Sequence, residues 1–322
     1  MASSWEQSAP ASEELLIPFI GSDRAQWFCC DNGAMARIAI VGAGAIGSVL
    51  AALLQSTGQH ELILCTRRPL PHLHVDTPEG SLDIRYTNLT TPSQADPVDW
   101  VLVATKTYDA PGAGAWIEHL CRQGAPVAVI QNGVEHRERF APYVSIEKIV
   151  PVIIDCPAER RSPGSVHQRG PAELFIQADA LGRSFTAMFH GSAAQITLTA
   201  DFLSAAWRKL CINSAGSISA LLGKPAGVFQ DEAIGEATLE VVRECAAVGR
   251  AVGAILDEDL PQKVLTQYRN YPIDSVNSLL ADRLAGRPME TDARIGVIVR
   301  YGRQHNIPTP RNSLLLALLE AI

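Results

Sequence analysis

The chain has 322 residues, long enough to bury a large core and to form two domains. Its content of 47% hydrophobic and 19% charged residues is ordinary for a globular protein. The formal net charge of -7 argues against nucleic acid or an anionic membrane surface as partner. A local basic pocket for an acidic small molecule remains compatible with this charge.

Residues 1–34 precede the first strand pattern. Their apolar run at 15–20 is too short, and too interrupted by proline, for a signal peptide or a membrane span. We predict an N-terminal extension that is either disordered or the product of an upstream start codon. Seven scattered cysteines, without CxxC or metal-ligand spacing, indicate reduced thiols in a cytoplasmic protein and no metal site.

A short apolar strand at 37–41 runs into a turn with G-x-G-x-x-G spacing and then into a helical pattern. Gly42 allows the tight turn, Gly44 lets the backbone approach a pyrophosphate, and Gly47 lets the helix pack on the strand. Packing alone is the competing explanation, but the flanking strand and helix favour dinucleotide binding. The predicted cofactor-binding residues of this turn are Gly42, Ala43, Gly44, Ala45, Ile46 and Gly47.

The second strand, at 61–65, ends in Arg67 and Arg68, about 20 residues beyond the glycine turn. A carboxylate there would hold the ribose 2′-hydroxyl of NAD, whereas a guanidinium suits the 2′-phosphate of NADP. Arginines after a strand are also common in solvated turns. Their position favours NADPH as cofactor, with Arg67 as the main contact.

Strands and helices alternate up to about residue 200, which predicts a parallel sheet with helices on both faces. Helical periodicity then takes over, so we expect a Rossmann-type domain at 35–200 and an all-helical substrate domain at 201–322. The carboxyl ends of two strands place Lys106 and Asn132 at the expected ligand crevice. The predicted strands are 61–65, 99–104 and 126–130, short ones near 74 and 82, and several within 147–199; the predicted helices are 45–56, 112–122, 201–222, 231–252, 261–270, 290–305 and 311–321.

Lys209, Asn213 and Ser217 follow at i, i+4 and i+8 and so share one helix face. A polar stripe on a helix is usually its solvated side. Here the neighbouring residues are mostly apolar, so a stripe that faces the cleft between the domains is an equal alternative.

Five segments, in this order and spacing, resemble the ketopantoate reductase (2-dehydropantoate 2-reductase) family over roughly residues 35–322. They are 38–47, 103–106, 131–133, 207–213 and the run 278–292. The resemblance implies a Rossmann-type doubly wound sheet followed by an all-helical C-terminal domain. It also implies NADPH-dependent reduction of 2-dehydropantoate, or a closely related 2-ketoacid, toward pantothenate and coenzyme A.

The resemblance also implies roles for individual residues. Lys209 matches the catalytic lysine, and Glu290 a glutamate near that lysine and the nicotinamide. Two family asparagines have no counterpart, because Ser217 and Gly227 stand in their places, which predicts a roomier pocket with fewer donors. The implied substrate-binding residues are Asn132, Asn213, Ser217 and Ser278, and Lys106, Asn132 and Glu290 also border the cofactor.

Chemistry supports these roles. Hydride transfer to a ketone carbon leaves an alkoxide that must be stabilised and protonated, which an ammonium such as Lys209 does. A nearby carboxylate, Glu290, would favour the charged lysine, although Glu290 could instead interact with a helix dipole. Two other functions stay open: another NAD(P)-linked hydroxyacid or opine-type dehydrogenase, and a non-catalytic NADP(H) sensor. The sequence leaves the oligomeric state open, a homodimer being one alternative.

Overall fold

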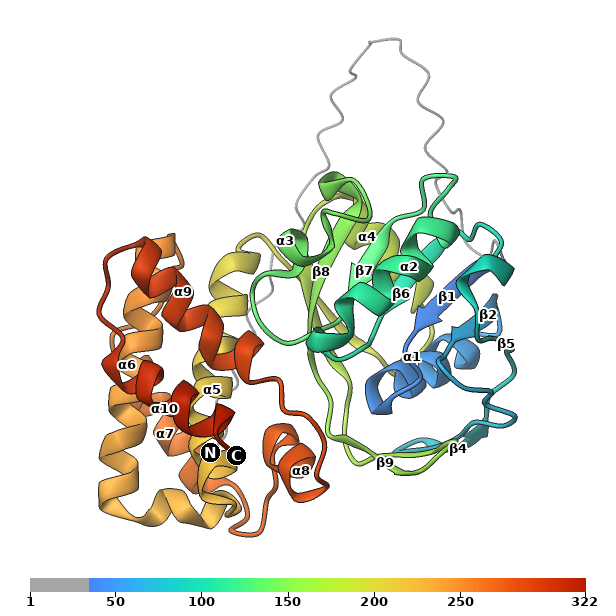
Figure 1. Cartoon of the computed structure of the whole chain (residues 1–322). Coiled ribbons are helices and arrows are strands. Elements are labelled where there is room, and N and C mark those ends of the chain that lie inside the picture. Colours follow the sequence, from blue (N-terminus) through green and yellow to red (C-terminus); the bar gives the residue numbers. More distant parts are fainter. Residues whose placement is uncertain (1–34) are drawn as a thin grey trace, which may run out of the picture.

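The structure is a computed structural model that describes residues 35–322, so the extension predicted at 1–34 lies outside the described residues. Figure 1 shows a sheet domain and a helical domain side by side, with helix α8 (Ser278–Leu284) on the side of the helical domain that faces the sheet. The last strand ends at residue 199, and helices follow from residue 202. The expected class, a Rossmann-like domain followed by a helical one, is confirmed.

The main sheet has eight strands in the order β12-β11-β8-β7-β6-β1-β2-β5. Only the β8–β11 pair is antiparallel. Strands of a parallel sheet covered on both faces need apolar side chains on both sides, and the central strands β1 and β6 are accordingly almost fully buried. The strands are β1 (Ala36–Val41), β2 (His60–Cys65), β5 (Thr87–Leu89), β6 (Trp100–Val103), β7 (Val127–Val129), β8 (Ile149–Asp155), β11 (Glu173–Gln177) and β12 (Gln195–Thr199).

Helices cover the two faces of this sheet. One face packs its core against α1 (Ala45–Ser56) and α4 (Ala180–Met188). The other packs against α2 (Ala110–Leu120) and α3 (His136–Phe140). Short 3-10 turns connect these elements: η1 (Pro92–Gln94), η2 (Thr107–Asp109) and η3 (Ile146–Lys148).

A second, four-stranded sheet has the order β4-β3-β10-β9 and lies below the main sheet in Figure 1. Val75 and Val166 of its two central strands are buried in the same core as α1. The strands near 74 and 82 are confirmed, but the pairing of the strand near 74 with residues 165–167 joins segments about 90 residues apart, which periodicity alone does not predict. The strands are β3 (His74–Thr77), β4 (Gly80–Asp83), β9 (Ala158–Ser162) and β10 (Ser165–Gln168).

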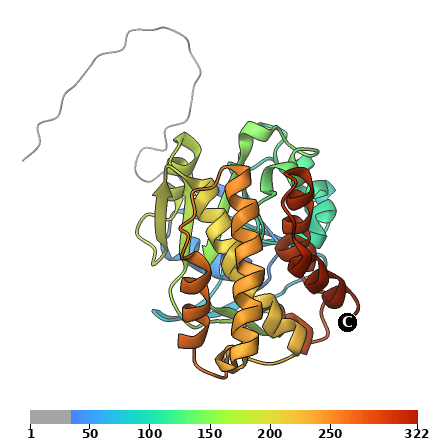
Figure 2. The same cartoon turned by 90° about the vertical axis from the view of Figure 1, so that its left-hand side faces the viewer.

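The helical domain forms a layer in front of the sheet domain in Figure 2. Its central helix α5 begins where the Asp201 side chain accepts from the Ser204 N–H, and it ends at Gly223, whose φ of 66° is left-handed. Trp207 of α5 is fully buried and meets Tyr301 edge to face. The elements are α5 (Phe202–Leu222), η4 (Ala226–Gln230), α6 (Glu232–Val252), α7 (Leu260–Asn270), α8 (Ser278–Leu284), the π-helical η5 (Asp292–Gly296), α9 (Val297–Gln304) and α10 (Pro310–Glu320).

The helix predicted at 290–305 is divided in the structure, since its first part is the π-helical segment η5 and its second part is α9. Helices α3, α4 and α8 were not predicted, and each is short, with at most nine residues. Within residues 35–322, no helix is both long and apolar enough to cross a bilayer. The same residues contain no group of three or more His, Cys, Asp or Glu side chains that could hold a metal ion.

Candidate active site

The glycine turn has the geometry of a phosphate-binding loop. Gly42 has a φ of 102°, and its N–H donates to the Cys65 carbonyl at 3.0 Å. A Cβ on Gly47 would lie 2.0 Å from the Gly42 carbonyl oxygen, so only glycine lets α1 start this close to β1. At Gly44, nothing lies within 4 Å of a Cβ position, and no side chain caps the first N–H groups of α1. Space and donors are therefore both present for a pyrophosphate.

Arg67 and Arg68 follow β2 at the surface, as expected from their position. The side chain of Arg67 is 85% exposed, and its guanidinium lies 3.3 Å from Asp109 in the loop after β6. An exposed ion pair of this kind contributes little free energy, so an incoming phosphate can replace Asp109 at small cost. Arg68 is exposed as well.

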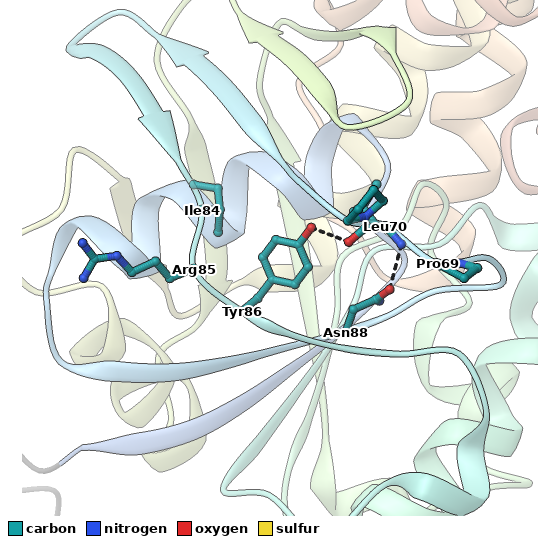
Figure 3. A pocket seen from close by; sticks show the side chains of 7 residues that line it. Pro69, Leu70, Ile84, Arg85, Tyr86 and Asn88 are labelled. Carbon is teal, nitrogen blue, oxygen red and sulfur yellow. Dashed lines mark hydrogen bonds between the residues drawn. The ribbon is translucent and has the colours of Figure 1, made fainter.

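Tyr86 and Asn88 form hydrogen bonds with Leu70, in the segment that follows the two arginines (Figure 3). Asn88 accepts from the Leu70 N–H at 2.8 Å and donates to the Thr66 hydroxyl at 2.9 Å, while the Tyr86 hydroxyl donates to the Leu70 carbonyl. Leu70, Tyr86 and Asn88 line an open pocket of about 510 Å³. None of the predicted catalytic or substrate-binding residues lines this pocket, so we do not assign the pocket to the reaction. The hydrogen bonds of Tyr86 and Asn88 stabilise the segment after the two arginines.

Glu290 is the most connected buried carboxylate at the carboxyl end of the sheet. Its side chain is 3% exposed and accepts from the Thr107 N–H at 3.0 Å, Asn132 Nδ2 at 2.9 Å and Lys106 Nζ at 3.2 Å. Burial raises the pKa of this carboxyl, but Lys106, Arg294 and the hydrogen bonds outweigh burial and leave the pKa below its ordinary value. Its oxygens bind the sheet domain and do not cap the helix that follows, which argues against the dipole interpretation.

Lys106, three residues after β6 ends, forms ion pairs with carboxylates from the other domain. Its Nζ lies 2.7 Å from Asp282 of α8 in addition to Glu290, and Asp282 also pairs with Arg287. Burial lowers the pKa of Lys106, yet the two carboxylates outweigh it and raise the pKa overall. In the sequence, Asp282 lies within the run 278–292 that resembles the family, and no spacing signal identifies it as the partner of a lysine 176 residues away.

The loop after β7 brings Asn132 between the two domains. Asn132 Oδ1 accepts from Asn213 Nδ2 of α5 at 3.4 Å, so Glu290, Asn132 and Asn213 form one hydrogen-bonded line. Gly133 has a φ of 96°, and a Cβ there would lie 2.9 Å from the Ala293 carbonyl oxygen. The loop therefore touches the segment that carries Glu290, and the predicted site residues Lys106, Asn132, Asn213 and Glu290 come together.

Lys209 lies one turn before Asn213 on α5, but it does not contact Glu290. Its Nζ donates to Asp155 Oδ2 at the end of β8, at 2.6 Å. The expectation that Glu290 orients this lysine is therefore corrected: Glu290 pairs with Lys106, and Asp155 is the carboxylate partner of Lys209. Sequence reasoning missed Asp155 because it lies 54 positions before Lys209 and no sequence signal indicates that β8 ends beside α5.

The remaining predicted positions, Ser217, Gly227 and Ser278, differ in their exposure and contacts. Ser217 is fully buried, and its hydroxyl donates to the Asn213 carbonyl, so the expected substrate contact from Ser217 is not supported. At Gly227 a Cβ would lie 3.0 Å from the Ile273 carbonyl oxygen, so Ile273 fills the space and the pocket is not roomier there. Ser278 is exposed at the start of α8, and its hydroxyl accepts from Arg294.

Comparison with known proteins agrees with this geometry. The model of the ketopantoate reductase PanE/ApbA family matches residues 38–180, and its C-terminal model matches residues 201–322. A 2-dehydropantoate 2-reductase of Caulobacter vibrioides is 44% identical over 89% of this chain and 99% of its own. The chain belongs to the ketopantoate reductase family.

Solved structures of the family have the same fold. A 2-dehydropantoate 2-reductase from Geobacter metallireducens superposes with a TM-score of 0.82 at 27% identity, over 88% of this chain and 99% of that one. The dimeric ketopantoate reductase from Staphylococcus aureus gives a TM-score of 0.79 at 25% identity, over 88% and 98%. Members of this family are pyridine-nucleotide oxidoreductases that act on ketoacids. This argues against the alternative of a non-catalytic NADP(H) sensor.

His136 yields a prediction about pH. The ring is buried, its Nε2 lies 2.9 Å from the Gln131 carbonyl oxygen, and it meets Phe202 edge to face across the domains. Burial lowers its pKa from 6.5 to about 4. Above pH 6.5 both folded and unfolded states are neutral; below it the unfolded state takes up the proton first, so stability falls until the pH reaches about 4.

We expect this histidine to remove about 2 kcal/mol of unfolding free energy between pH 7.5 and pH 5. His136→Gln keeps a donor for the Gln131 carbonyl but does not titrate. Urea unfolding at the two pH values should therefore show a smaller loss for the variant. An equal loss in both proteins would contradict the buried, neutral histidine.

Proposed function

We propose that this protein reduces 2-dehydropantoate (ketopantoate) to pantoate with NADPH, in the cytoplasm. The observation that carries the proposal is the line of Asn213, Asn132 and Glu290 across the cleft, with Lys209 one turn from Asn213. The 44% identical relative named 2-dehydropantoate 2-reductase supports the substrate. Five free cysteines among the described residues fit a reducing compartment.

Cofactor binding is assigned to the glycine turn, Arg67 and the crevice around Lys106. A bound nicotinamide supplies the hydride. The open backbone at Gly44 and the uncapped start of α1 bind the pyrophosphate, while Arg67 selects the 2′-phosphate. Asn132, fixed by its bond to Glu290, borders the place where nicotinamide and substrate meet.

The chain's residues then complete the reaction. As the carbonyl carbon gains hydride, its oxygen becomes an alkoxide, and the ammonium of Lys209 hydrogen-bonds to that oxygen and gives it a proton. Asn213 holds the same end of the substrate because it shares the helix face of Lys209. In the structure Lys209 donates to Asp155, and we propose that it exchanges this carboxylate for the substrate oxygen.

A homodimer is the assembly that we propose, on the precedent of the dimeric relative from Staphylococcus aureus. Light scattering of the purified protein tests it directly, because a monomer and a dimer of this 34.6 kDa chain differ twofold in mass.

The cofactor assignment predicts the effect of Arg67→Ala. A hydrogen bond to a charged group contributes about 1.5 to 3 kcal/mol, so the variant should bind NADPH roughly 10- to 150-fold more weakly and NADH almost unchanged. Fluorescence titration measures both dissociation constants. Arg85→Ala removes another exposed arginine and serves as the control; equal weakening toward both cofactors in Arg67→Ala would rule out the 2′-phosphate contact.

The proton-donor assignment predicts the kinetics with ketopantoate. Lys209→Ala should lower kcat by about 10² to 10⁴, the range typical of general acid catalysis, and leave the NADPH dissociation constant within about threefold. Steady-state NADPH oxidation with ketopantoate tests the proposed reaction in the wild type. The same measurement in the variant tests the role of Lys209 as proton donor. Lys263→Ala, which removes an exposed lysine of α7, is the control, and near-normal turnover of Lys209→Ala would exclude Lys209 as the donor.

A further inference from the structure

Asp109 brings a carboxylate to the turn that carries Arg67. The segment after β2, residues 66–72, has two arginines and no acidic residue. The Asp109 carboxylate comes from η2, after β6, and lies 3.3 Å from the Arg67 guanidinium although the two residues are 42 positions apart. In sites that prefer NAD, a carboxylate near the end of the second strand binds the ribose 2′-hydroxyl. Here the structure supplies such a carboxylate from a different loop.

The Arg67–Asp109 pair joins the two loops that flank the glycine turn. Strand β1 lies between β2 and β6 in the sheet. The Gly42 N–H donates to the Cys65 carbonyl at the end of β2, and a Cβ on Gly42 would lie 2.8 Å from Thr105 in the loop after β6. Arg67 follows Cys65, and Asp109 follows Thr105, within the same two loops. A dinucleotide bound at this turn places its adenosine ribose beside the end of the second strand, so both side chains border that ribose.

The carboxylate of Asp109 is not used by its own helix. Asp109 is the N-cap of α2, where an aspartate commonly accepts from the first N–H groups, but its side chain makes no such bond. The backbone of this turn is anchored, because the Asp109 N–H donates to the Lys106 carbonyl and the Thr107 N–H donates to Glu290. The Asp109 side chain is 30% exposed. It is therefore a carboxylate on an anchored turn, accessible to a ligand.

The ion pair acts in opposite directions on the two nicotinamide cofactors. The 2′-phosphate of NADPH carries about two negative charges, so Arg67 attracts it and Asp109 repels it. The 2′-hydroxyl of NADH is neutral and donates a hydrogen bond, which a carboxylate accepts well and a guanidinium cannot accept. Because an exposed ion pair is weak, either partner can turn from the other to the ligand at small cost.

We propose that Asp109 is a cofactor-selecting residue that reduces the preference for NADPH. It competes with the 2′-phosphate for Arg67, and it accepts a hydrogen bond from the ribose 2′-hydroxyl of NADH. This inference rests on the proposed NADPH-dependent reduction and adds a second cofactor to it. The same site then binds NADPH through Arg67 and NADH through Asp109, so the protein uses both.

The experiment measures the dissociation constants of NADPH and NADH by fluorescence titration of the wild type and Asp109→Asn. The amide keeps the size of the side chain and removes its charge. NADPH should bind roughly 2- to 5-fold more tightly, because Arg67 is released from its partner. NADH should bind roughly 3- to 30-fold more weakly, because an amide is a poorer acceptor than a carboxylate. Asp96→Asn, which changes an exposed aspartate of the same domain, is the matched control and should alter neither value.

A second probe tests the contact with the ribose itself. The NADH analogue that lacks the adenosine 2′-hydroxyl should bind the wild type roughly 3- to 30-fold more weakly than NADH does, and should bind Asp109→Asn about as well as NADH does. Equal binding of NADH and this analogue to the wild type would overturn the proposal.

Three further results would also overturn it. They are a shift of NADPH and NADH affinity in the same direction in Asp109→Asn, an unchanged NADH affinity in that variant, and no measurable binding of NADH to the wild type. A wild type that binds both cofactors and reduces no 2-ketoacid would instead refute the proposed reaction, and the role of Asp109 would still be decided by the dissociation constants.

Discussion

The arrangement of the two domains depends on the hydrogen bonds and the ion pair that the Glu290 carboxylate forms across the domain boundary. Glu290 belongs to the helical domain, yet its hydrogen bonds go to Lys106, the Thr107 N–H and Asn132 of the sheet domain. A carboxylate that is 3% exposed is stable only when such partners replace its water. The contact therefore requires the carboxyl ends of β6 and β7 to lie against the segment at 287–294, which places the cleft.

Other features of the cleft follow from this contact. Asp282 can reach Lys106 only because α8 is brought to the same edge of the sheet. Asn132 is fixed on one side by Glu290 and meets Asn213 of α5 on the other. Lys209, a turn away on α5, then reaches Asp155 at the end of a third strand. Each domain thus supplies part of the site, and neither holds it complete.

The sequence was most informative where the signal is local. The strand, glycine turn and helix at 36–56 follow from spacing and sterics, since Gly47 permits a contact that no other residue allows. Lys106 and Asn132 were placed in the crevice because strand ends in a parallel sheet share one edge. The family resemblance identified Lys209, Asn213 and Glu290 as candidate site residues. It did not indicate which side chains they pair with.

The contacts between residues far apart in the chain could not be predicted from the sequence. The Lys106–Glu290 pair joins residues 184 apart, and periodicity carries no information about such a distance. Arg294 reads as an ordinary helix residue until its burial is seen, and Ser217 reads as a cleft residue until its hydroxyl is found on the Asn213 carbonyl. The extra space expected at Gly227 is absent for the same reason, because Ile273, which fills it, lies 46 residues further on.

A double-mutant cycle tests the central role of the Glu290 contact. Unfolding free energies of Lys106→Met, Glu290→Gln and the double variant give the coupling between the two side chains across the domains. The account predicts a coupling of at least about 1 kcal/mol, because Lys106→Met leaves the buried Glu290 charge without this ion-pair partner, and Glu290→Gln then removes that charge. Single effects that add within about 0.5 kcal/mol would mean that the pair does not join the domains, and would contradict the account.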